Sequence, residues 1–242
     1  GMVPFCNIYS TFMQRAYDNV IHDVAIQGLP VVMCLDRGGL VGEDGVTHHG
    51  VFDMAAFGAV PGLTVAAPMN EPELRNMMWT GLQAGAPFMI RYPRGLGEGL
   101  PWRGLPFETL PVGRGRRLRE GRDVALVTVG TVGNAAARAA ERAAAQGVEA
   151  AHYDLRWVKP LDTELLDEVG RTFRRVITVE DGCLRGGVGE AVAAYFNARG
   201  YDAHVTCLGI GDTWVEHGTP EQLHALCGYD EESILRALTQ PA

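Results

Sequence analysis

The sequence predicts an α/β protein with two doubly wound units. Short apolar runs alternate with segments of helical period, which is typical of parallel strands joined by covering helices. The alternation stops in a stretch rich in glycine, proline and arginine, and it starts again at Val124. A length of 242 residues is sufficient for two ordinary domains. We therefore expect domains at residues 1–96 and 123–242, joined by a linker at 97–122.

The first unit is predicted to have four strands, at residues 5–9, 30–35, 63–67 and 87–92. Ser10 or Thr11 can cap a helix after the first strand that reaches about Gln27, with apolar residues at a spacing of four. Asn70 and Glu73 form a capping box ahead of another helix. Alternating strands and helices of this kind indicate a largely parallel sheet.

A glycine-rich loop at residues 36–50 follows the second predicted strand. It contains five glycines, and between them stand Asp36, Arg37, Glu43, Asp44, His48 and His49. Open α/β sheets bind ligands beyond the carboxyl ends of their strands, so this combination of acid, base and cation is a candidate site. The alternative is an ordinary solvated surface loop, since loops are usually polar.

Three arginines are predicted to share one edge of the sheet. Arg37 and Arg94 come just after strands, and Arg15 lies in the first turn of a helix that follows one. The carboxyl ends of parallel strands meet at the same edge. Guanidinium groups bind carboxylates and phosphates in a bidentate manner, so the three together predict an anion site.

The second unit repeats the alternation. Strands are predicted at residues 124–129, 148–154, 175–179 and 203–208, and helices at 134–146, 162–169, 186–199 and from 220 to the end. Asp162 can cap the second of these helices. The glycines at 186–189 do not fit GxGxxG, and we expect them to allow close strand–helix packing. The arginines of the linker are expected to face an acidic surface rather than nucleic acid.

Composition and net charge limit the kinds of partner that the protein can bind. A formal net charge of −8 argues against a nucleic-acid coat and against binding to anionic membranes. No apolar run approaches the length of a membrane span. The five cysteines are scattered without CxxC spacing, and three lie in apolar runs, which predicts buried thiols in a reduced, cytoplasmic compartment rather than disulfides or a zinc site.

Five segments resemble the 1-deoxy-D-xylulose-5-phosphate synthase family, thiamine-diphosphate enzymes of the transketolase superfamily. They are residues 8–18 (IYSTFMQRAYD), 36–50 (DRGGLVGEDGVTHHG), 90–95 (IRYPRG), 154–162 (DLRWVKPLD) and 216–220 (EHGTP). The resemblance covers essentially the whole chain. It implies an incomplete pyrimidine-binding domain followed by a smaller transketolase C-terminal-like domain.

The resemblance also implies a reaction. Pyruvate condenses with D-glyceraldehyde 3-phosphate, carbon dioxide leaves, and the product, 1-deoxy-D-xylulose 5-phosphate, is a precursor of isoprenoids, thiamine and pyridoxal. Phe12 is expected to pack on the aminopyrimidine ring of the cofactor, with Tyr9 nearby. The expected catalytic residues are His48, Asp44 and Arg37, and the expected substrate-binding residues are Arg15, Arg37, Arg94 and Tyr9. His48 would move protons, Asp44 would orient polar groups, and His49 is left out because it should point the other way.

Two features of the family do not occur in this sequence. There is no Gly-Asp-Gly motif, which holds the diphosphate and Mg²⁺ in the family, and no glutamate precedes Glu43 to drive ylid formation. We therefore expect no metal ligands in this chain, a missing N-terminal segment as its partner, and no activity of the chain alone. The family further implies a homodimer.

Two alternatives remain at this stage. The β subunit of a thiamine-diphosphate 2-oxoacid dehydrogenase also joins a pyrimidine domain to a C-terminal domain, but it would carry its own glutamate. A non-catalytic assembly fragment would also fit the C-terminal unit, which is short of charged loop clusters.

Overall fold

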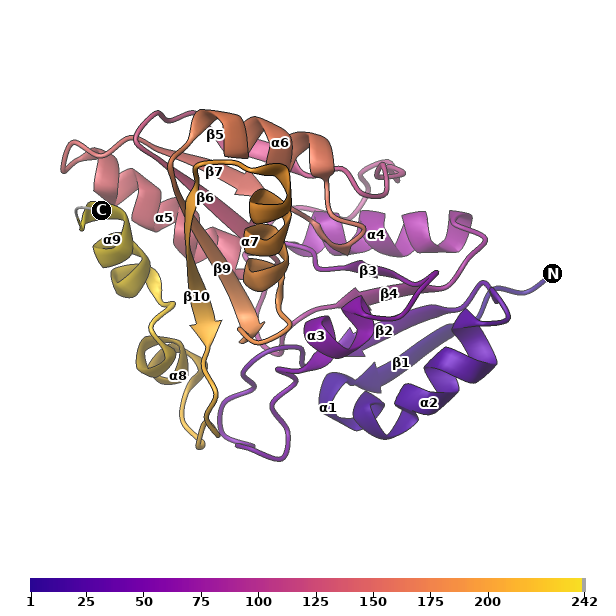
Figure 1. Ribbon diagram of the computed structural model, residues 1–242. Coiled ribbons are helices and arrows are strands. Elements are labelled where there is room, and N and C mark those ends of the chain that lie inside the picture. Colours follow the sequence, from indigo (N-terminus) through magenta and orange to yellow (C-terminus); the bar gives the residue numbers. More distant parts are fainter. Residues whose placement is uncertain (241–242) are drawn as a thin grey trace.

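Two five-stranded sheets form the centre of the structure, a computed structural model that describes residues 1–240 (Figure 1). The first has the order β1-β2-β4-β3-β8, with strands β1 Phe5–Tyr9, β2 Val32–Asp36, β3 Thr64–Ala66, β4 Phe88–Arg91 and β8 Trp157–Lys159. The second has the order β10-β9-β6-β7-β5, with strands β5 Arg116–Arg119, β6 Val124–Val129, β7 Ala150–Asp154, β9 Arg175–Cys183 and β10 His204–Ile210. The predicted fold class is confirmed.

Helices cover both faces of each sheet (Figure 1). They are α1 Ser10–Met13, α2 Tyr17–Asn19, α3 Asp53–Gly58, α4 Glu71–Gln83, α5 Val132–Ala144, α6 Thr163–Thr172, α7 Val188–Arg199, α8 Pro220–Cys227 and α9 Glu231–Thr239. On the first sheet, α4 packs on one face, and α3 with residues 10–25 packs on the other. On the second, α5, α8 and α9 lie opposite α6 and α7.

One strand crosses from the second half to the first sheet, and another forms inside the expected linker. β8 comes from the second half but pairs antiparallel with β3 of the first sheet, with Val65 opposite Lys159. β5 lies inside the segment expected to be a linker and pairs antiparallel with β7, with Arg116 opposite Asp154. Neither strand was predicted, because β8 has three residues and β5 consists largely of arginine, as edge strands often do. The domains are therefore interlocked rather than simply joined.

The helical segment after β1 is less regular than predicted. Residues 10–25 pass through α1, a 3-10 turn at Gln14–Ala16, α2 and a π turn at Val20–Ala25. The predicted cap at Ser10 or Thr11 is wrong, because Tyr9 occupies the N-cap position and makes no side-chain cap bond. The buried Ser10 hydroxyl donates instead to Asp53, at 2.9 Å.

Two other predicted caps form. The Asn70 side chain accepts from the Glu73 amide (3.1 Å), and Asp162 accepts from the Leu165 amide (3.1 Å). The reciprocal half of the Asn70–Glu73 box is absent among the bonds of residues 1–240. One Glu73 oxygen binds Arg156 and Arg116, and the other accepts from the Met69 amide (2.9 Å) instead of the Asn70 amide.

The acidic surface expected opposite the basic linker belongs to the chain itself. The arginines pair with carboxylates of the second unit: Arg114 with Asp162 and Glu164, Arg116 with Asp154, Arg117 with Glu168, and Arg119 with Glu149. All five cysteines are free. Of the three in predicted strands only Cys34 is buried, whereas Cys6 is exposed and Cys207 is partly buried, because β1 and β10 are edge strands.

His152 on β7 should make stability depend on pH. Burial, followed by the charge of Arg116, lowers the pKa of His152 from 6.5 to about 4, and Thr128 shares a hydrogen bond with its ring (2.9 Å). Between these pH values the unfolded chain binds a proton that the folded protein does not, so stability falls as the pH is lowered. We expect this group to remove about 3 kcal/mol between pH 7 and pH 4.

The measurement is urea unfolding of the natural chain and of His152→Gln at several pH values. The variant cannot take up the proton, so the stability advantage of the natural chain should shrink by that amount on acidification. Comparing the two chains cancels the opposite contribution of Glu180, whose pKa burial raises to about 6. If the unfolding free energies of the two chains changed with pH in parallel, His152 would not be the group responsible.

Candidate active site

The loop that follows β2 lies between the two sheets (Figure 1). Residues 37–50 are called the central loop below. The Gly38 amide donates to the Tyr92 carbonyl (2.9 Å), which ties the start of the loop to the end of β4. Gly39 and Gly50 exchange two backbone hydrogen bonds of 2.8 Å, which close the loop at its base. The polar residues between them are thus held at the carboxyl edge of the first sheet.

Five of the predicted site residues form one stack. The Arg37 guanidinium lies 3.8 Å from the centre of the Tyr9 ring, and Tyr9 stacks on Phe12 with centroids 5.0 Å apart and planes 3° apart. Phe12 meets the His48 ring edge-on at 5.5 Å, and the Arg15 guanidinium lies 5.8 Å from the Phe12 ring. This aromatic stack combines a flat ring surface with two cations and an imidazole, the groups needed to bind an aromatic ring beside an anion.

Arg94 and Asp44 form a separate pair. Their side chains are joined at 3.0 Å and are 43% and 42% exposed, and Arg94 also donates to the Val41 carbonyl at 3.4 Å. Arg37 pairs with its neighbour Asp36. The structure therefore brings Arg15 and Arg37 to the aromatic stack and places Arg94 on the central loop through Asp44.

The two adjacent histidines have different environments. His48 is half-buried beside the aromatic stack, and its Nδ1 lies 2.9 Å from the Thr47 hydroxyl. His49 is buried, and its Nδ1 accepts from the Val41 amide (3.1 Å). The proton of His49 is then on Nε2, which faces the Glu216 carbonyl at 3.3 Å. His48 is available to a ligand, whereas His49 fixes the loop.

A buried ion network below the loop was not predicted. Arg91 of β4 donates to Asp53 (3.1 Å), to the Asp181 carbonyl (2.8 Å) and to the Gly50 carbonyl (3.5 Å). The Ser10 hydroxyl donates to the same Asp53 oxygen. Burial lowers the pKa of Arg91, but the charges of Asp53 and Asp181 outweigh it and raise the pKa above its ordinary value. One signal was available, since a charge inside a strand with two buried faces requires a buried partner.

Asp181 of β9 contacts the central loop from the second domain. Its Oδ1 accepts from the Leu40 amide (3.0 Å) and from the Tyr229 hydroxyl (2.8 Å). Its side chain is 4% exposed, and burial followed by the charge of Asp181 raises the pKa of Tyr229 well above its ordinary value. The loop that carries the predicted site is thus bonded to both domains.

The glycine-rich segment at 186–189 binds a carboxylate of the protein itself through two backbone amides. Glu180 accepts from the amides of Val188 (2.9 Å) and Gly189 (2.8 Å) at the start of α7. A Cβ at Gly189 would lie 2.6 Å from the Thr178 hydroxyl oxygen, so the close strand–helix approach that was predicted is present.

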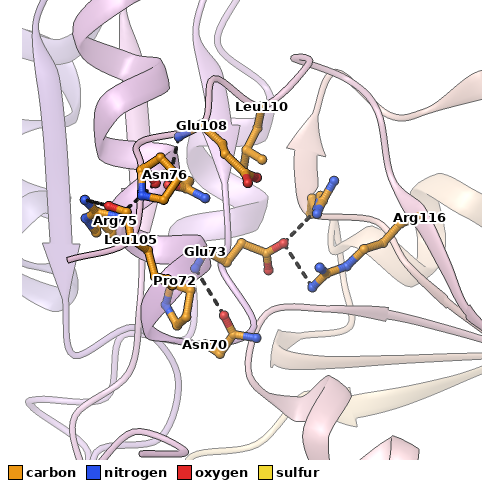
Figure 2. A pocket seen from close by; sticks show the side chains of 11 residues that line it. Asn70, Pro72, Glu73, Arg75, Asn76, Leu105, Glu108, Leu110 and Arg116 are labelled. Atoms are coloured by element: carbon orange, nitrogen blue, oxygen red, sulfur yellow. Dashed lines mark hydrogen bonds and ion pairs between the residues drawn. The ribbon is translucent and has the colours of Figure 1, made fainter. Parts of the chain in front are cut away.

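A polar cavity of about 290 Å³ lies elsewhere between the domains (Figure 2). Glu73 of α4 meets Arg156 (2.7 Å) and Arg116 (3.0 Å) there, and Arg116 also binds Asp154 (3.0 Å). Burial, followed by the charge of Glu73, raises the pKa of Asp154. Because each carboxylate in this group has an arginine partner, the cavity is explained as part of the contact between the domains, and none of the predicted site residues lines it.

Within residues 1–240 there is no group of three or more His, Cys, Asp or Glu side chains that could hold a metal ion. No helix in the same range is long and apolar enough to cross a membrane. Tyr9 and Phe12 are only partly buried, so the aromatic stack keeps exposed ring surface on which a planar group could pack.

The fold and the loop chemistry match one class of enzyme. The transketolase pyrimidine-binding domain matches residues 1–98, and the transketolase C-terminal domain matches residues 113–234. The chain belongs to the transketolase family. A solved structure titled "Split gene transketolase, inactive beta4 tetramer" has a TM-score of 0.84 and 28% identity, over 98% of this chain and 75% of that chain.

Curated relatives identify the branch of the family. The chain is 55% identical over 242 residues to the 1-deoxy-D-xylulose-5-phosphate synthase of Bacteroides fragilis and 56% identical over 240 residues to that of Bacteroides thetaiotaomicron. The match covers 99% and 98% of this chain but 37% of each relative. The chain thus corresponds to a C-terminal portion of a 1-deoxy-D-xylulose-5-phosphate synthase, as its motifs predicted. These comparisons give no support to a 2-oxoacid dehydrogenase β subunit or to a non-catalytic assembly fragment.

Replacing Arg91 by methionine should strongly destabilise the chain. The substitution leaves Asp53 buried without its cation, and breaking a buried pair in this way costs about 3 to 5 kcal/mol. The measurement is the free energy of unfolding in urea.

Arg94→Met is the matched control. It removes an arginine that also pairs with an aspartate, but the pair is exposed, and such pairs contribute about 0 to 1 kcal/mol. Equal losses of unfolding free energy in the two variants would show that the buried Arg91–Asp53 pair stabilises the structure no more than an exposed pair does.

Proposed function

We propose that this chain supplies the pyrimidine-binding and C-terminal parts of an enzyme that condenses pyruvate with D-glyceraldehyde 3-phosphate. Carbon dioxide is released and 1-deoxy-D-xylulose 5-phosphate forms. The observation that carries the proposal is the aromatic stack with its two arginines and His48, found in a chain so similar to enzymes of that name. We divide the chain into a pyrimidine-binding domain at 1–96, a connection at 97–122 and a C-terminal domain at 123–242.

Each residue then has a role. Phe12 and Tyr9 hold the aminopyrimidine ring of thiamine diphosphate, which when bound supplies the electron sink for the new carbon–carbon bond. Arg15, Arg37 and Arg94 bind the carboxylate of pyruvate and the phosphate of the aldehyde. Asp44 orients Arg94, which it contacts at 3.0 Å. His48 transfers protons at the substrate oxygens, and the Thr47 hydroxyl orients its ring.

In this proposal, other parts of the enzyme lie outside this chain. The groups that hold the diphosphate and Mg²⁺, and the glutamate that activates the cofactor, belong to an N-terminal segment present in the longer relatives. The chain alone is then inactive, and its partners are that segment and a second copy of the enzyme in a cytoplasmic homodimer. The similar split-gene transketolase supports the inactivity of the chain alone, because that structure is described as an inactive tetramer of β subunits.

Joining the missing segment to this chain tests the function. The N-terminal portion of the Bacteroides fragilis relative that precedes the matched region is fused to residue 1. Native mass spectrometry reports assembly, and release of carbon dioxide from pyruvate with glyceraldehyde 3-phosphate reports turnover. We expect the chain alone to be inactive and the fusion to be active in the presence of thiamine diphosphate and Mg²⁺. A fusion that assembles and binds thiamine diphosphate but makes no product would overturn the proposal.

His48→Ala in the active fusion tests the site. Loss of a positioned proton-transfer group should lower kcat by about 10² to 10⁴ while assembly persists. His22→Ala is the control, because His22 is an exposed histidine of the same domain paired with Asp18. Unchanged turnover in His48→Ala, or equal losses in both variants, would remove His48 from the mechanism.

A further inference from the structure

One side chain of the second domain forms a hydrogen bond with the start of the central loop. Asp181 lies on β9, yet its Oδ1 accepts the Leu40 amide of the central loop at 3.0 Å, across 141 residues of sequence. Leu40 is three residues from Arg37, which covers the Tyr9 ring. A bond at Leu40 therefore constrains the segment that places the Arg37 guanidinium.

The start of the central loop has a backbone that needs such a constraint. Arg37 has φ of 57° and Gly39 has φ of 81°, both in the left-handed region. A residue with a side chain rarely adopts this conformation at Arg37 unless its surroundings impose it. At Gly39 a Cβ would lie 1.9 Å from the Asp181 carboxylate, so the carboxylate is packed directly against the loop backbone.

Asp181 is itself held firmly. The Tyr229 hydroxyl donates to the same Oδ1 at 2.8 Å, and the Asp181 backbone carbonyl accepts from Arg91 at 2.8 Å. His224 Nε2 faces the other carboxylate oxygen at 3.8 Å. Because these contacts fix the Asp181 carboxylate, it can hold the Leu40 amide in one position.

Other contacts between the second domain and the loop lie farther from Arg37. The Gly218 amide donates to the Gly42 carbonyl (3.4 Å), and His49 faces the Glu216 carbonyl (3.3 Å). These contacts hold the tip and the return of the loop, whereas Asp181 holds its start.

We infer that Asp181 is a positioning residue for the active site, through which the C-terminal domain sets the backbone from Leu40 to Arg37 and hence the place of the Arg37 guanidinium. The inference rests on the proposed function. It gives the C-terminal domain an indirect part in binding the substrate anion, through the position of Arg37.

Hydrogen exchange of the 242-residue chain tests the structural half without any assay of activity. Asp181→Ala should speed exchange of the Leu40 amide and its neighbours in residues 37–50 by about fivefold to tenfold, the change expected for loss of one hydrogen bond. Asp181→Asn keeps an acceptor oxygen and should restore most of the protection. Tyr229→Phe removes one hydrogen bond that fixes Asp181, and it should give an exchange rate between those of the natural chain and Asp181→Ala.

Asp162→Ala is the matched control. Asp162 is also a buried aspartate of the C-terminal half and accepts two backbone amides, from Leu165 and Gly115, but these bonds lie away from the central loop. Exchange in residues 37–50 should not change in this variant. Equal acceleration by Asp162→Ala and Asp181→Ala would show general loosening and overturn the inference.

Kinetics of the fusion enzyme test the functional half. In Asp181→Ala a displaced Arg37 should raise KM for the anionic substrates and lower kcat/KM by about 10-fold to 10²-fold, with rescue in Asp181→Asn. A purely structural role would lower the unfolding midpoint and leave KM unchanged.

Two outcomes separate the two proposals. An inactive natural fusion would count against the proposed function. Values of kcat and KM in Asp181→Ala equal to those of the natural fusion would count against the positioning role alone. If Asp181→Ala does not fold, Tyr229→Phe decides by the same two readouts.

Discussion

The buried guanidinium of Arg91 is the interaction on which the remaining structure depends. An unpaired cation in this position would be very costly, because water is excluded from it. Asp53 supplies the opposite charge, and the carbonyls of Asp181 and Gly50 take further donors. These partners come from α3, from β9 and from the base of the central loop, so satisfying one side chain brings together both domains and the candidate site.

Further contacts join the two domains. β8 adds to the first sheet. The Glu73 carboxylate of the first domain binds Arg156 of the second domain, and it also binds Arg116 of β5 (Figure 2). Leu40 and Val51, which flank most of the central loop, pack in the core of the second domain. The loop is therefore part of both domains, and its geometry is a property of their contact. The second domain therefore contacts the central loop both by packing and by the hydrogen bond from Leu40 to Asp181.

Positions relative to strands predicted that Arg15 and Arg37 would lie at one edge of the first sheet. The structure places their guanidinium groups beside the rings of Phe12 and Tyr9. The third predicted arginine, Arg94, pairs with Asp44 on the central loop. Arg91 and Asp181 were missed because their roles depend on partners 38, 90 and 141 residues away, for which a single sequence gives no spacing rule.

The sequence alone determined the two doubly wound units, most strands, the caps at Asn70 and Asp162, and the glycine-rich loop after β2. These features depend on hydrophobic period, on side chains that bond to near neighbours and on the conformational freedom of glycine, all of which are local. The tertiary structure alone decided that β8 would cross to the first sheet, that Ser10 would bind Asp53 rather than cap a helix, and that Asp181 would hold Leu40. Each of these outcomes is set by competition among buried polar groups for partners, and that competition is resolved only when distant segments pack together.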